Sequence, residues 1–161
     1  PLHIESNQSK EEGFGLLNVT TTIEPKKTTH QVKARAITKE SYFSQGETIS
    51  GYEIHMGRTT LLEGASPVFT IFERSGKKTE LKDGAISKDG KVWGTYIHGL
   101  FDNASFRQCL LNHLRKQKGV IEVEKDKEEP ITAYKNSQYN KLAQLVRANL
   151  NMEKVYRIIG R

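Results

Sequence analysis

The fold of this chain is decided by residues 92–101, which read Val-Trp-Gly-Thr-Tyr-Ile-His-Gly-Leu-Phe. Side chains alternate between the two faces of a strand, so Tyr96 and His98 share one face while Trp93 and Ile97 share the other. Both faces are mostly apolar, as in a strand that is covered on both sides. We therefore predict a buried strand that ends at His98. The carboxyl ends of strands in open α/β sheets collect catalytic groups, which makes His98 the first candidate site residue.

Several segments before residue 92 also have the pattern of strands. Alternating apolar residues predict a half-buried strand over 31–37 and further strands over 48–62 and 68–74. The pair Asp89-Gly90 suits a tight hairpin turn, so 85–87 should pair antiparallel with the chain from Val92 onward. The sequence thus predicts a sheet around residues 92–98.

Beyond His98 the apolar period changes to that of a helix. Asp102 or Asn103 can cap this helix, and Gly119 suits its end. The apolar stripe consists of Phe106, Cys109, Leu110, His113 and Leu114. After a charged linker over 122–129, Pro130 begins a second helix, and Asn151 caps a short last one.

Composition narrows the class of protein. The 161 residues fit one domain, and no apolar run approaches the ~20 residues needed to span a bilayer, so we expect no membrane partner. The net charge of +6 comes from lysines that are scattered among acidic residues, which argues against a nucleic-acid partner. The single cysteine, Cys109, fits a reducing compartment, and we expect a cytoplasmic protein.

The residues that could carry chemistry each have a structural alternative. His98 could merely hydrogen-bond a backbone carbonyl, and the residues alone slightly favour that role. Glu53 and His55 share one face of the predicted strand 48–62 and could form an acid/base pair, although a polar pair on the wet face of a sheet is commoner. Cys109 lies in an apolar helical stripe, where a structural thiol is the better interpretation than a nucleophile. Tyr96 is a supporting candidate beside His98.

Metal and nucleotide sites find little support in the sequence. The five histidines stand apart, with neither a His-x-x-x-His nor a Cys-x-x-Cys spacing. The chain also contains neither Gly-x-x-x-x-Gly-Lys-Ser/Thr nor Gly-x-Gly-x-x-Gly. We therefore expect no metal and no cofactor in this chain.

Two long motifs resemble a known family. They are Gly-Tyr-Glu-Ile-His-Met-Gly-Arg-Thr over 51–59 and Val-Trp-Gly-Thr-Tyr-Ile-His-Gly-Leu-Phe-Asp-Asn over 92–103, the latter followed by Phe106-Arg107. Residues 13–17 and the helical tail 139–159 also look like that family. The chain resembles, over nearly its whole length, the CobB/CobQ-type class I glutamine amidotransferase domain of cobyric acid synthases.

This resemblance implies a fold and a function. The implied fold is a class I amidotransferase-like, flavodoxin-like α/β domain, with a mostly parallel sheet and an added antiparallel portion. The implied enzyme hydrolyses glutamine to supply ammonia for amidation of corrin carboxylates, while a separate synthetase domain uses ATP and Mg²⁺. A cysteine attacks the glutamine amide and a histidine, here His98, transfers the protons.

The chain departs from this pattern in two ways. The Gly-rich cysteine motif of the family is absent, which implies that the chain is the C-terminal part of the domain and is inactive alone. Leu100 also stands where many class I enzymes carry the glutamate of a triad, so a cysteine-histidine dyad is expected unless Glu53 substitutes in space. Loss of the nucleophile strand would leave open sheet edges, and we expect self-association.

The expected organisation is a single domain over 1–161. It comprises a connecting segment over 1–12, the sheet with the histidine strand and the following helix over 13–119, and a linker with C-terminal helices over 120–161. Partners implied by the resemblance are glutamine, ammonia, a corrin and the missing N-terminal part. The alternatives are the amidotransferase domain of a cobyrinic acid a,c-diamide synthase and a non-catalytic binding or assembly domain.

Overall fold

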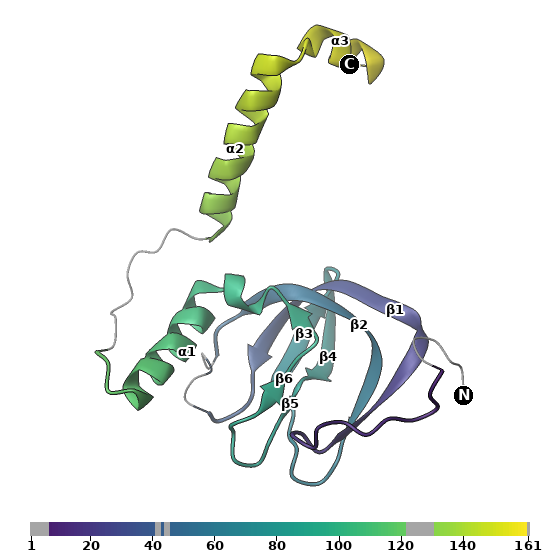
Figure 1. The fold of residues 1–161 in the computed structure, drawn as a ribbon, viewed down its shortest axis with the longest axis vertical. Coiled ribbons are helices and arrows are strands. Elements are labelled where there is room, and N and C mark those ends of the chain that lie inside the picture. Colours follow the sequence, from purple (N-terminus) through teal and green to yellow (C-terminus); the bar gives the residue numbers. More distant parts are fainter. Residues whose placement is uncertain (1–6, 41–42, 44–45, 122–130, 161) are drawn as a thin grey trace. The chain divides into compact units, whose positions relative to one another are not determined.

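A computed structural model describes residues 7–40, 43, 46–121 and 131–160. The chain divides into two compact units, Pro1–Val123 and Glu124–Arg161, where the sequence suggested one domain. The first unit contains all the strands of the described residues, and the second contains two helices (Figure 1). The predicted linker over 122–129 and Pro130 lie outside the described residues.

The first unit is built on a five-stranded sheet of order β4-β3-β1-β2-β7. Its strands are β1 (Val19–Ala36), β2 (Ile49–Leu61), β3 (Phe69–Arg74), β4 (Lys77–Asp83) and β7 (Ile97–His98). A smaller sheet pairs β5 (Ala85–Ile86) with β6 (Trp93–Gly94). The predicted strands over 31–37, 48–62 and 68–74 are confirmed.

Every strand pair among the described residues is antiparallel. The mostly parallel sheet of the predicted fold is therefore not found among the described residues, whose strands pair only in antiparallel fashion. The order of elements explains why: parallel neighbours need a crossover, usually a helix, and all helices described here follow β7 in the sequence. The β3–β4 connection is instead a tight turn at Ser75 and Gly76, both with positive φ.

The prediction of one strand over 92–98 is wrong. The chain changes sheets within this stretch, since β6 pairs with β5 whereas β7 pairs with β2. The side chain of Asp83 causes the break, because it accepts hydrogen bonds from the Thr95 hydroxyl and, at 3.3 Å, from the Tyr96 N–H. The predicted hairpin between 85–87 and Val92 onward is confirmed.

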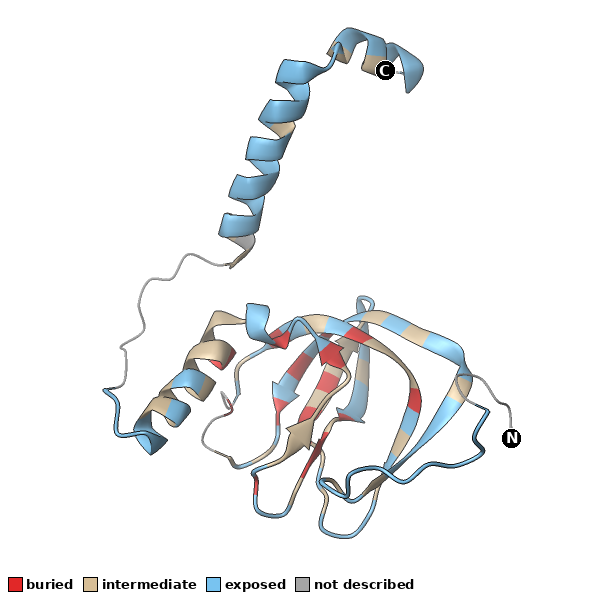
Figure 2. Cartoon of the chain, viewed as in Figure 1, coloured by how far each residue is buried: buried red, intermediate tan, exposed pale blue. Residues whose placement is uncertain are grey.

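The core lies between the sheet and the helix α1 (Ala104–Gln117), as the buried residues in Figure 2 show. Phe43, Phe69 and Phe106 are each at most 2% exposed, and the ring of Phe43 packs edge-on against Phe69 and tilted against Phe106. A short 3₁₀ turn, η1 (Leu100–Asp102), joins β7 to α1 and buries Leu100. The predicted start and end of α1 are confirmed.

The second unit consists of α2 (Ile131–Asn149) and α3 (Met152–Ile158). The Asn151 side chain caps α3 by accepting the Lys154 N–H at 3.0 Å, as the sequence predicted. Neither these helices nor α1, as far as the model describes them, is long and apolar enough to cross a membrane.

Candidate functional site

His98 ends β7 at one edge of the five-stranded sheet. It lies opposite Tyr52 of β2, while Ile97 lies opposite Glu53. Cross-strand partners share a face, so the His98 and Tyr52 side chains lie on one face and those of Ile97 and Glu53 on the other. His98 is exposed, and its ring makes no hydrogen bond or ion pair with any described residue. The imidazole is therefore available to a partner from outside the described residues.

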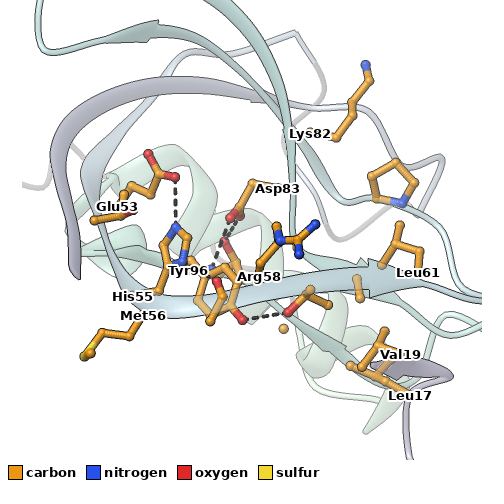
Figure 3. A pocket seen from close by; sticks show the side chains of 18 of the residues that line it. Leu17, Val19, Glu53, His55, Met56, Arg58, Leu61, Lys82, Asp83 and Tyr96 are labelled. Atoms are coloured by element: carbon orange, nitrogen blue, oxygen red, sulfur yellow. Dashed lines mark hydrogen bonds and ion pairs between the residues drawn. The ribbon is translucent and has the colours of Figure 1, made fainter. Parts of the chain in front are cut away.

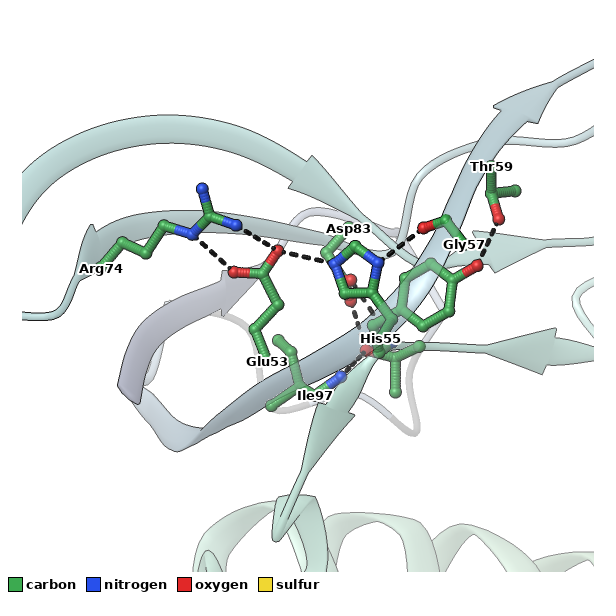
Figure 4. Close-up of polar contacts among 9 residues, drawn as sticks. Glu53, His55, Gly57, Thr59, Arg74, Asp83 and Ile97 are labelled. Atoms are coloured by element: carbon green, nitrogen blue, oxygen red, sulfur yellow. Dashed lines mark hydrogen bonds and ion pairs between the residues drawn. The ribbon is translucent and has the colours of Figure 1, made fainter. Parts of the chain in front are cut away.

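Glu53, on the opposite face, is buried and 6% exposed. Its carboxylate accepts two hydrogen bonds from Arg74 of β3, from Nε at 2.7 Å and from Nη2 at 3.0 Å. His55 Nε2 lies 3.0 Å from the same carboxylate (Figure 4). The sequence placed Glu53 and His55 on one face correctly, but it is the buried face rather than the wet one, and Arg74 supplies the opposite charge to Glu53 there.

Both ring nitrogens of His55 face hydrogen-bond acceptors. Nε2 meets the Glu53 carboxylate, and Nδ1 lies 2.6 Å from the carbonyl oxygen of Gly57. A neutral imidazole has only one N–H, whereas the imidazolium has two. Whichever nitrogen carries the N–H, the His55 ring therefore has a hydrogen-bond partner within the chain.

Tyr96 covers the His55 ring. Its ring stacks on that of His55, with centroids 4.2 Å apart and planes 16° from parallel. Such stacking of aromatic rings is favourable. The Tyr96 hydroxyl lies 2.6 Å from Thr59 Oγ1, which in turn lies 2.7 Å from Thr21 Oγ1. Tyr96 thus connects the His55 side of the sheet to the segment that leads to His98.

Asp83 is the second buried carboxyl group of this region, at 7% exposure. Burial away from water raises its pKa above the usual 3.8, and the hydrogen bonds from Thr95 and Tyr96 oppose that rise only in part. The Thr95 hydroxyl oxygen also accepts the Ile97 N–H at 3.0 Å. Asp83 therefore holds the three residues before His98 in place.

A cavity of about 470 Å³ opens on the face of Glu53 and His55. Figure 3 shows His55, Asp83 and Tyr96 at its polar end and Leu17, Val19 and Leu61 on its apolar wall. His98 is not among the lining residues. The structure brings together Glu53, His55 and Tyr96, and it places His98 apart from them.

The remaining candidates take no part in this arrangement. Cys109 lies on α1 and is half-buried. No group of three or more His, Cys, Asp or Glu side chains within the described ranges could hold a metal ion. The sequence missed Arg74 and Asp83, which it assigned to a strand end and a turn. Arg74 matters through its ion pair with Glu53, and Asp83 through its burial and its hydrogen bonds to Thr95 and Tyr96. No local pattern in the sequence shows such distant contacts.

Comparison with known proteins gives a consistent family. Residues 1–106 match the model of the CobB/CobQ-like glutamine amidotransferase domain. The chain is 44% identical to a cobyric acid synthase of Thermoanaerobacter sp. (strain X514) over 100% of its own length and 32% of that protein. It is 42% identical to the cobyric acid synthase of Clostridium tetani, over 99% of the chain and 30% of the relative.

A third cobyric acid synthase, from Streptococcus sanguinis (strain SK36), is 41% identical over 100% of the chain and 30% of that protein. The chain thus spans about a third of the length of the curated relatives that it matches. Through its match over residues 1–106, the chain belongs to the CobB/CobQ-like glutamine amidotransferase domain family.

Proposed function

We propose that this chain is the C-terminal part of the glutamine amidotransferase domain of a cobyric acid synthase. The longer enzyme would convert adenosylcobyrinic acid a,c-diamide to cobyric acid in cobalamin biosynthesis. The observation that carries the proposal is the exposed His98, with its ring unbonded to the described residues, within a chain of this family.

In this proposal His98 transfers protons for a cysteine in the preceding part of the domain. The thiolate attacks the side-chain carbonyl carbon of glutamine, the C–N bond breaks, and ammonia leaves with a proton from His98. His98 then takes a proton from water, which hydrolyses the thioester to glutamate and frees the thiol. The chain alone would carry the histidine without the nucleophile, and it would not hydrolyse glutamine.

The geometry favours a dyad over a triad that includes Glu53. The Glu53 carboxylate is bonded to Arg74 and His55, on the face of β2 opposite to His98. A carboxylate so placed cannot also orient the His98 ring. Glu53, His55 and Tyr96 are then supports of the sheet rather than members of the catalytic set.

The remainder of the domain would add the parallel sheet of a class I, flavodoxin-like fold. β7 is an edge strand, and an edge offers unpaired backbone groups to a further strand. ATP and Mg²⁺ would act in the synthetase domain that delivers the activated corrin carboxylates to ammonia.

The test uses the full-length enzyme that carries this sequence. We expect ATP-dependent amidation of the a,c-diamide with either glutamine or ammonia as nitrogen donor. His98→Ala should lower the glutamine-supported rate by about 10³-fold, within the range for a lost general acid-base, and leave the ammonia-supported rate unchanged. Unchanged glutamine use would contradict the role of His98.

The choice of corrin separates the alternatives. Preference for cobyrinic acid over its a,c-diamide would assign the chain to a cobyrinic acid a,c-diamide synthase. Absence of glutamine-supported amidation with either corrin would favour a binding or assembly domain.

A further inference from the structure

Asn103 stands at the N-cap of α1, but its side chain makes no capping hydrogen bond. Asparagine is among the best N-cap residues, because its side-chain oxygen can accept an N–H of the first turn. In this chain Oδ1 instead accepts the backbone N–H of Ser50 at 2.9 Å, and Nδ2 donates to the Ser50 carbonyl at 2.9 Å. The side-chain amide thus pairs with both backbone groups of Ser50, as a residue of a neighbouring strand would.

This pairing continues the ladder that holds His98. β7 runs antiparallel to β2 and ends at the pair of His98 with Tyr52, two residues from Ser50. Gly99 then adopts a positive φ of 76° and the backbone turns into η1. Because the backbone has left the ladder, the Asn103 amide supplies the next pair in its place.

The same side-chain amide of Asn103 also bonds backbone carbonyls of the loop that follows His98. Nδ2 also donates to the carbonyl of Leu100 at 2.9 Å and approaches that of Gly99 at 3.3 Å. On the strand side, a Cβ at Gly51 would lie 2.5 Å from the His98 carbonyl oxygen, so β2 and β7 approach closely there. The backbone of His98 is restrained on both sides while its ring is left exposed.

We propose that Asn103 is a positioning residue for His98. Its amide fixes the loop over 99–102 to Ser50, so that the imidazole keeps one position relative to β2. The inference rests on the proposed role of His98 in glutamine hydrolysis. It predicts that loss of the amide disturbs the chemical step more than the binding of glutamine.

The experiment compares Asn103→Asp and Asn103→Ser in the full-length enzyme, with His98→Ala alongside. Asp and Ser cap helices about as well as Asn, so both variants preserve the start of α1. Neither can donate an amide N–H to the Ser50 and Leu100 carbonyls. Steady-state kinetics with glutamine and with ammonia, together with thermal unfolding, are measured for each.

We expect both Asn103 variants to lower kcat with glutamine about 10- to 100-fold, as for a catalytic group misplaced by about 1 Å. KM for glutamine should stay within about threefold and the ammonia-supported rate should not change, because the synthetase reaction does not use His98.

Three results would overturn the inference. They are an unchanged kcat with glutamine, an equal fall with ammonia, and loss of folding in both variants, which would assign Asn103 to stability alone. His98→Ala separates this failure from that of the proposed function. If His98→Ala abolishes glutamine use while both Asn103 variants keep it, only the positioning role fails; if His98→Ala keeps it, the proposed function fails.

Discussion

His55 and His98 lie on the neighbouring strands β2 and β7 in opposite surroundings. His55 is held by Glu53 on one nitrogen and by the Gly57 carbonyl on the other, beneath the ring of Tyr96. His98 is exposed, and no described residue bonds its ring. Both histidines belong to motifs that resemble the same family, and the resemblance assigns proton transfer to His98.

Under the proposed function, the two faces of the sheet have different roles: one stabilises the fold and the other presents the histidine that transfers protons. On the His55 face the buried Glu53 carboxylate is bonded by both Arg74 and His55, and such a closed network stabilises the packing without offering a group to a substrate. On the His98 face the fold restrains the backbone and leaves the ring open. A histidine whose ring nitrogens are both hydrogen-bonded within the chain, such as His55, fits a structural role. A histidine whose backbone is restrained while its ring is exposed, such as His98, fits a role in binding or catalysis.

The largest effect on stability should come from Glu53→Ala. Removal of this carboxylate leaves Arg74 without its counter-charge and His55 without a hydrogen-bond partner at Nε2. We expect the free energy of unfolding to fall by about 3 kcal/mol, the lower end for a broken buried pair because the Arg74 side chain is 30% exposed. Denaturant unfolding of the chain measures the change.

Glu73→Ala is the matched control. Glu73 pairs with Lys33 at 3.0 Å, but the two side chains are 32% and 48% exposed. A surface pair of this kind should contribute less than about 1 kcal/mol. Equal losses in the two variants would contradict a distinct, closed network around Glu53.

Tyr96→Phe should have a smaller effect. It keeps the ring that stacks on His55 and removes the hydroxyl that bonds Thr59. We expect a loss of about 1 kcal/mol in unfolding free energy, typical of one hydrogen bond. Tyr52→Phe is the control, because Tyr52 is 50% exposed on the His98 face, and it should change nothing measurable. A larger loss of unfolding free energy in Tyr52→Phe than in Tyr96→Phe would contradict the account, because it would mean that the His98 face contributes more to stability than the His55 face.

Asp83→Asn should change the pH dependence of stability. The pKa of Asp83 is raised above 3.8 in the folded chain, chiefly by burial, so between the two values the folded state holds a proton that the unfolded state has lost. The contribution of Asp83 to stability is therefore complete below pH 3.8 and is lost as the pH rises through the folded pKa.

The stability of the wild type relative to Asp83→Asn should thus decline as the pH rises from about 3.8 and then level off. Unfolding at a series of pH values gives this difference. A difference that grew with pH would show that Asp83 is stabilised as the anion, and it would remove burial as the cause of its shift.

Local pattern predicted much of the fold. Alternation placed the strand over 31–37, with Val32, Ala34 and Ala36 buried. The Asp89-Gly90 turn and the helix after Asn103 also followed from local residue preferences. The break at Thr95 and Tyr96 did not, because it depends on Asp83, which is 12 residues from Thr95 in the sequence.

The candidate site was predictable in its residues but not in its arrangement. The motifs selected Glu53, His55, Tyr96 and His98. That Glu53 is buried depends on Arg74, which lies 21 residues along the chain and on another strand. The register of β7 on β2, which places His98 away from Glu53, depends on the same kind of distant contact. Such contacts have no local pattern in a single sequence.

The central claim is that His98 is open to chemistry and His55 is not. The rate of carbethoxylation of each histidine by diethyl pyrocarbonate, followed by mass spectrometry of the folded chain, tests it most directly. We predict that His98 reacts as an exposed histidine, and that His55 reacts at least about 10-fold more slowly because its reaction must first break the hydrogen bonds of the ring to Glu53 and to the Gly57 carbonyl. Equal rates, or faster modification of His55, would contradict the account.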